Sequence, residues 1–226
     1  MTPAELYADV RVRVSDLVRD LPADRLATRV PGCPAWTVHD VVAHATGIVA
    51  DVNAGNTEGL ASEPWTQAQV ESRRSRPIGA VLDEWSEQAA TMEPRLNDVP
   101  KAIWRTVLID LVTHEHDIRG ALKEPGGRDS EAYEIARKGF AVGLAKAIEE
   151  RGLPGLRLEA DDWQFDAGPE PRATVRTTDS FEFFRALAGR RGIKQVLAFE
   201  WSTDPEPYLP ILNHFGPVPD EDIVES

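Results

Sequence analysis

The spacing of apolar residues changes once along this chain, and the change divides it into a helical part and a mixed part. From the N-terminus to about residue 152, apolar side chains recur every three or four positions, which is typical of amphipathic helices. After that point the period becomes two, with Leu156, Leu158 and Ala160 separated by polar residues, which favours strands. We therefore expect an α+β protein, in which a mainly α helical bundle at residues 1–152 precedes a small α+β domain at residues 153–226.

Capping and turn residues set the expected element boundaries. Thr37 begins one helix, because its hydroxyl can cap the first turn while Asp40, three residues later, completes a capping box. Pro125-Gly-Gly127 ends another helix. The expected helices cover residues 2–22, 37–53, 65–74, 78–97, 102–122, 130–152, 180–190 and 208–215, and the expected strands cover residues 156–160, 163–165, 173–175 and 197–201.

Charge and composition exclude several classes of partner. The formal net charge of −13 argues against nucleic acid, whose phosphates would be repelled. No apolar run approaches the roughly 20 residues of a membrane-spanning helix, and the N-terminus lacks a signal-peptide pattern. The single cysteine, Cys33, precludes an internal disulfide, and we interpret it as a packing residue rather than a nucleophile. We expect a cytoplasmic protein that binds neither nucleic acid nor a membrane, and the sequence leaves its oligomeric state open.

One segment of the helical part carries the side chains of a metal site. Asp110 and His114 lie four residues apart, so on a helix both point to the same face. A carboxylate and an imidazole one turn apart form half of a typical divalent-metal site, and His44 on another apolar helix can complete it. Three ligands leave one position open for chemistry. The alternative is that these side chains form a buried hydrogen-bond network or face solvent separately.

Two motifs carry a resemblance to a known family. Residues 33–44, CPAWTVHDVVAH, resemble the segment C-P-G-W-[ST]-V-x-D-[LV]-x-x-H of the mycothiol-dependent maleylpyruvate isomerase family. Residues 110–122, DLVTHEHDIRGAL, resemble its segment E-x-x-x-H-x-x-D-[IL]-R-x-A-L. A third stretch, FEFFRALAGRR at residues 181–191, resembles the family's C-terminal helix. The resemblance implies a DinB-like metal-binding four-helix bundle followed by a small C-terminal α+β domain.

The resemblance also implies a ligand set. His44 matches the first metal ligand, Asp110 occupies the place of a glutamate, and His114 matches the last ligand. Zinc is the implied metal, although other divalent transition metals accept the same donors. Asp110 departs from the family pattern, and its shorter side chain requires the metal to sit closer to this helix or to bind more weakly. Asp117 is expected to orient a ligand by hydrogen bonding or to pair with Arg119 or Arg105.

The implied activity uses a thiol that the protein does not itself supply. A metal with an open position can present mycothiol as a thiolate, so no catalytic side chain of the chain itself is assigned. We expect a metal-dependent, mycothiol-using isomerase or thiol S-transferase that acts on a small electrophile. If the substrate is anionic, Arg190 and Arg191 are the expected counter-charges. The alternatives are a metal-dependent hydrolase on the same bundle and a non-catalytic protein that binds a metal or small ligand.

Overall fold

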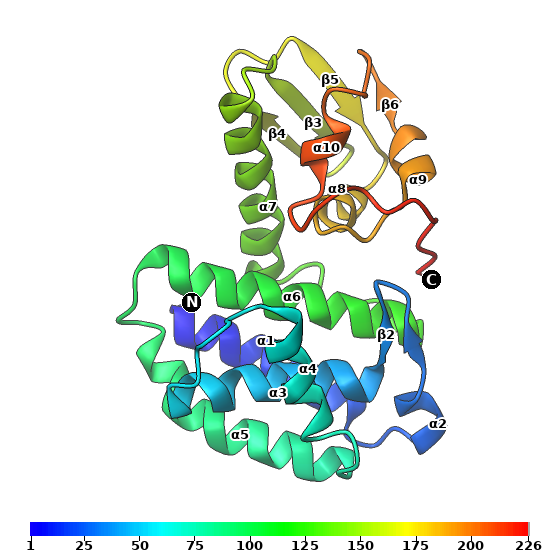
Figure 1. Cartoon of the computed structure of the whole chain (residues 1–226). Helices are drawn as coiled ribbons and strands as arrows, with labels where there is room; N and C mark the ends of the chain where they lie inside the picture. Colours follow the sequence, from blue (N-terminus) through cyan, green and yellow to red (C-terminus); the bar gives the residue numbers. More distant parts are fainter. Residues whose placement is uncertain (226) are drawn as a thin grey trace. The chain divides into compact units, whose positions relative to one another are not determined.

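The computed structural model describes residues 1–225, which form two compact units (Figure 1). The bundle unit comprises Met1–Gly127 and Glu225, and the sheet unit comprises Arg128–Val224. Helices dominate the bundle unit, and a four-stranded sheet with helices forms the sheet unit. The expected α+β class is confirmed. Among the described helices, none is both long and apolar enough to cross a bilayer.

Four long helices form the frame of the bundle unit. Helices α3 and α1 each pack against both α5 and α6, which closes a four-helix bundle, and α4 packs on the outside of α3. Helix α3 is the most deeply buried, with Val41, Val42 and Val49 fully inaccessible. The elements of this unit are α1 (Pro3–Val18), α2 (Ala23–Leu26), β1 (Arg29–Val30), β2 (Cys33–Thr37), α3 (Val38–Ala54), α4 (Glu63–Glu71), α5 (Ile78–Arg95) and α6 (Lys101–Leu122).

A short hairpin leads directly into α3. Strands β1 and β2 pair antiparallel, with Arg29 opposite Thr37, although the sequence pattern predicted no strand here. Thr37 ends β2 and is also the N-cap of α3. The predicted capping box is present, because the Asp40 backbone donates to Thr37 Oγ1 at 3.2 Å and the Thr37 backbone donates to Asp40 Oδ2 at 3.0 Å.

The sheet unit has the strand order β4-β3-β5-β6. Strands β3 and β4 form an antiparallel hairpin, β5 runs parallel to β3, and β6 pairs antiparallel with β5. The predicted alternation is visible on β3, where Leu156 and Leu158 are fully buried. The elements are α7 (Glu131–Glu150), β3 (Leu156–Ala160), β4 (Trp163–Ala167), β5 (Ala173–Arg176), α8 (Ser180–Leu187), α9 (Ile193–Leu197), β6 (Glu200–Trp201) and α10 (Leu209–Leu212).

Helix α7 belongs to the sheet unit by its contacts. It packs against α8, β4 and α10, so the compact units divide before α7 and not after it, where the sequence period changes. Tyr133 and Phe140 from α7 make aromatic contacts with Phe184 of α8, with ring centroids 5.3 and 5.8 Å apart. A change of period marks the end of a helix, but it carries no information about which neighbour that helix packs against.

Candidate metal centre

Helices α3 and α6 bring the three predicted ligands together. One ligand atom each from His44, Asp110 and His114 lies within 4.8 Å of the other two. His114 Nε2 is 3.7 Å from Asp110 Oδ1, and the His44 and His114 rings meet edge to face with centroids 5.2 Å apart. The one-turn spacing on α6 and the packing of α3 against α6 therefore produce the cluster that the sequence suggested.

The three side chains differ in their access to solvent. His44 and His114 are buried, at 4% and 7% relative exposure, whereas the Asp110 side chain is 40% exposed. Asp110 is thus only partly buried, although the residues on either side of it in the sequence are apolar. The reason is that Asp110 lies at the edge of the buried face of α6, on which Leu111 and His114 point inward. The cluster is consequently closed on the imidazole side and open on the carboxylate side.

Each imidazole is held on its Nδ1 atom by a side-chain oxygen. His44 Nδ1 lies 2.8 Å from Gln69 Oε1, and the Gln69 amide nitrogen donates in turn to Asp51 Oδ2 at 2.7 Å. His114 Nδ1 lies 3.1 Å from Oδ2 of the fully buried Asp117. Such contacts fix the ring orientation of metal-binding histidines and leave Nε2 for the metal.

Strand β2 supplies two further side chains at the cluster. The Trp36 ring centroid is 4.9 Å from that of His44 and 6.2 Å from that of His114, so the indole packs over both imidazoles. Cys33 is half-buried, and its Sγ lies 3.7 Å from Asp117 Oδ2. Cys33, His114 and Asp117 form a second group whose ligand atoms lie within 4.8 Å of one another.

Burial changes the protonation of His44. Desolvation in the bundle core, aided by the adjacent His114 ring, lowers the pKa of His44 from 6.5 to about 4. The ring is therefore neutral at pH 7 and has a lone pair available to bind a metal. This is the protonation state that a histidine ligand requires.

The lowered pKa of His44 predicts a pH-dependent stability in metal-free protein. Between about pH 4 and 6.5 the unfolded chain protonates this histidine and the folded chain does not, so stability rises with pH across this window and levels off above it. The pKa difference corresponds to about 3 kcal/mol. Opening free energies from hydrogen exchange of α3 amides after chelator treatment should show this rise in wild type, and the rise should shrink by that amount in His44→Asn. Parallel pH profiles of the two proteins would contradict the prediction.

The other histidines of the bundle unit lie away from the proposed ligand set. His116 is buried, at 2% relative exposure. Its position two residues after His114 turns it to another side of α6. His39 on α3 lies with Nε2 2.9 Å from the Arg76 carbonyl oxygen.

Glu115, which lies between His114 and His116 in the sequence, has a structural role that the sequence did not reveal. Its carboxylate has no exposed surface and accepts from Arg13 of α1 at 2.7 and 2.9 Å. Arg119, which we considered as a partner for Asp117, also binds Glu115, with Nη2 at 3.0 Å from Oε1. One face of α6 therefore carries the cluster, and another is tied to α1 by an ion-pair network.

Arg190 and Arg191 lie in the sheet unit after α8. Arg191 donates to both carboxylate oxygens of Glu182, at 2.6 and 2.8 Å, and Arg190 donates to the Ala188 carbonyl oxygen at 2.8 Å. The ion pair with Glu182 offsets the charge of Arg191. A role for either arginine in binding an anionic substrate stays a prediction.

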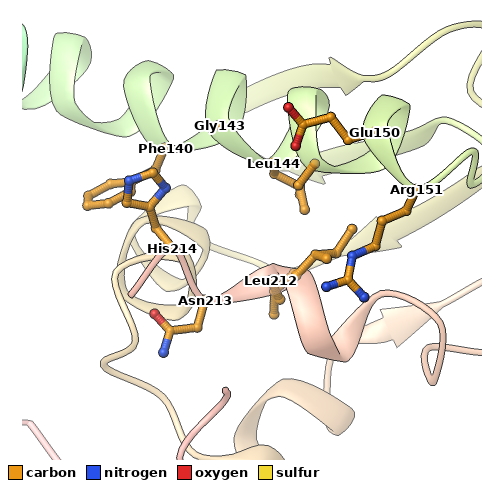
Figure 2. Close-up of a pocket in the computed structure, with 10 residues that line it drawn as sticks. Phe140, Gly143, Leu144, Glu150, Arg151, Leu212, Asn213 and His214 are labelled. Atoms are coloured by element: carbon orange, nitrogen blue, oxygen red, sulfur yellow. The ribbon is translucent and has the colours of Figure 1, made fainter. Parts of the chain in front are cut away.

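Each unit has a pocket, within the part of the chain that the structure describes, that lies outside the cluster. In the bundle unit, a pocket of about 540 Å³ is lined by Arg29, Thr37, His39 and Arg74, among others. In the sheet unit, a pocket of about 210 Å³ lies between α7 and the segment around α10 (Figure 2). Figure 2 shows the His214 ring against Phe140, and the two centroids are 5.7 Å apart. Neither pocket is lined by any of the three proposed ligands.

The fold and the cluster define a class of protein: a four-helix bundle with two histidines and a carboxylate on facing helices, joined to a small α+β unit. The model of the mycothiol maleylpyruvate isomerase N-terminal domain matches residues 7–124, more than half of the chain. The chain belongs to this family, and the predicted resemblance is confirmed.

A solved structure and the curated proteins give further comparisons. The crystal structure of a histidine-to-alanine mutant of the mycothiol-dependent maleylpyruvate isomerase is similar, with a TM-score of 0.54 and 12% identity. The match covers 88% of this chain and 91% of that chain. At this identity the likeness shows the fold alone. No curated protein matches the sequence.

Proposed function

We propose that this protein binds one divalent metal ion, zinc, through His44, Asp110 and His114. We further propose that it uses mycothiol as the thiol cosubstrate of an isomerisation or thiol S-transfer on a small electrophile. The observation that carries the proposal is the convergence of three ligand atoms within 4.8 Å on helices α3 and α6. The family, which is named for mycothiol and maleylpyruvate isomerase, supports the thiol and the reaction class.

The donor set fits such an ion. His44 is neutral at pH 7 because its pKa is about 4. Both rings engage an oxygen through Nδ1, and Nε2 of His114 lies on the side of Asp110. Two imidazoles and one carboxylate are a ligand set found in catalytic zinc sites, where a fourth position stays open. The exposed Asp110 marks the side on which that position meets solvent.

The surrounding residues prepare the centre for thiol chemistry. A bound divalent metal lowers the pKa of a coordinated thiol and so supplies a nucleophilic sulfur near neutral pH. Trp36 covers the two imidazoles and excludes water from that side, while Gln69 and Asp117 keep the rings in place. Thr37, as both strand end and helix cap, fixes the position of Trp36 relative to His44.

The two proposed reactions differ in the fate of the thiol. Addition of the sulfur to one carbon of an electrophilic double bond, with a proton delivered to the other, leaves a single bond about which the substrate can rotate. Loss of the thiol and of that proton restores the double bond and releases an isomer. If the carbon–sulfur bond persists, the product is a thioether and the thiol is consumed. Free thiol and product measured together therefore distinguish isomerase from transferase, and turnover without thiol would instead indicate the hydrolase alternative.

Substitutions at Asp110 test the proposed ligand set. Asp110→Glu should preserve or tighten metal binding, because glutamate is the residue that the family pattern carries at this position. Asp110→Ala should weaken binding by more than about tenfold, since a ligand is removed rather than merely reoriented. Competition with a chromogenic chelator measures both affinities, and His39→Ala on α3 is the matched control. Equal affinity of wild type and Asp110→Ala would show that Asp110 is not a ligand.

A further inference from the structure

We propose that Asp51, acting through Gln69, sets the tautomer of His44 so that the proton resides on Nδ1 and Nε2 is left to bind a metal. Asp51 and Gln69 are thus positioning residues: they orient His44, the proposed ligand, and do not bind the metal themselves. The functional meaning of this inference rests on the proposed metal centre. Its structural part concerns the metal-free protein and can be tested there.

The direction of each hydrogen bond follows from the carboxylate at the end of the chain of contacts. An ionised carboxylate only accepts, so the Gln69 atom that lies 2.7 Å from Asp51 Oδ2 must be the amide nitrogen. The Gln69 amide oxygen is then the atom that lies 2.8 Å from His44 Nδ1. An amide oxygen also only accepts, so His44 must donate from Nδ1. The unprotonated atom of the ring is therefore Nε2.

Packing on α3 holds Gln69 in this position. His44, Gly47 and Asp51 lie at positions i, i+3 and i+7, which form one stripe of the helix. A Cβ atom at Gly47 would come within 2.4 Å of Gln69 Cβ and 2.6 Å of its Cγ, so only glycine allows this close approach of α4. Gln69 is 2% exposed, and Arg73 Nη1 donates to the backbone carbonyl oxygen of Gln69 at 3.1 Å.

Because of Asn56, the hydrogen bonds from Asp51 through Gln69 to His44 should respond when one carboxylate oxygen of Asp51 is replaced by an amide nitrogen. The Asn56 side-chain amide donates to Asp51 Oδ1 at 2.9 Å, and as long as Asn56 keeps this orientation that position must hold an acceptor. In Asp51→Asn, the new amide oxygen stays opposite Asn56 and the new amide nitrogen faces Gln69. Gln69 must then turn its oxygen toward residue 51 and its nitrogen toward His44. The His44 ring would have to accept on Nδ1 and carry its proton on Nε2.

The test combines a spectroscopic measurement with metal titration. Nitrogen-15 chemical shifts of the histidine rings in metal-free protein at pH 7.5 report which nitrogen is protonated. Wild type should show His44 protonated on Nδ1, and Asp51→Asn should show it protonated on Nε2. The apparent affinity for Co²⁺ should fall in Asp51→Asn by about 10- to 100-fold. The double variant Asp51→Asn with Gln69→Glu should restore both readouts, because the carboxylate introduced on α4 accepts from both neighbours.

Controls separate this inference from a general loss of structure and from the proposed function. Asn56→Ala removes a partner of Asp51 but leaves the carboxylate, so the His44 tautomer should not change. A wild-type His44 protonated on Nε2 would overturn the inference, and so would an unchanged tautomer in Asp51→Asn when Asn56 still donates to residue 51. A wild-type protein that has the expected tautomer but binds no Co²⁺ would refute the proposed metal centre while leaving the tautomer assignment in place.

Discussion

Replacing His114 with alanine should reduce metal affinity by more than about 100-fold, beyond the 10- to 100-fold loss typical of residues that only hold a ligand. The reason is that His114 belongs to both groups of ligating atoms: the proposed centre with His44 and Asp110, and the group with Cys33 and Asp117. Its removal leaves neither group with three donors. Elemental analysis of protein purified without added metal measures the loss, and one ion per wild-type chain is the expected reference.

The parallel variant His44→Ala identifies which group binds the ion. If the proposed centre is correct, His44→Ala and His114→Ala lose metal alike, and His39→Ala retains it. Retention of metal in His44→Ala with loss in His114→Ala would place the ion between Cys33, His114 and Asp117 instead. Full metal content in both variants would refute a site at either group.

The second large effect concerns stability rather than chemistry. Glu115→Gln should lower the free energy of unfolding of the bundle unit by about 3–5 kcal/mol, because it leaves the Arg13 and Arg119 guanidinium groups without their buried counter-charge. Hydrogen exchange of α1 and α6 amides measures this change within the bundle unit. Hydrogen exchange suits a chain with two compact units, because the two units need not unfold in one transition.

A matched control is available on the same arginine. Asp9 also pairs with Arg13, but its side chain is 42% exposed, so Asp9→Asn should cost no more than about 0.5 kcal/mol. Equal effects of Glu115→Gln and Asp9→Asn would show that burial of the Glu115 carboxylate contributes nothing special to the stability of the bundle.

Local sequence patterns predicted most of the helices and the proposed ligands. The capping box of Thr37 and Asp40 and the one-turn spacing of Asp110 and His114 depend on residues a few positions apart, so they are visible in the sequence. His44 was a candidate because it lies on another apolar helix, and the family resemblance supported it, but no local pattern tells which two helices face each other.

The residues that the sequence did not reveal depend on contacts between distant segments. Gln69 reaches His44 from a short, mainly polar helix that begins after a loop, and the buried Glu115 pairs with Arg13, which is 102 positions away in the sequence. The packing partners of α7 were likewise hidden, since amphipathicity shows that a helix has a buried face but not what covers it. In each case the missing information is tertiary packing.

The junction between β2 and α3 has a mechanical consequence. Because the last residue of the strand, Thr37, is also the cap of the helix, no loop separates β2 from α3. Trp36 and His44 are consequently joined by a short, continuous stretch of backbone, which the capping box of Thr37 and Asp40 holds in place. A ligand that pushes the indole aside would disturb the His44 ring, because the two rings are in contact, with centroids 4.9 Å apart. Occupancy above the indole and the orientation of His44, the proposed ligand, are in this way expected to be coupled.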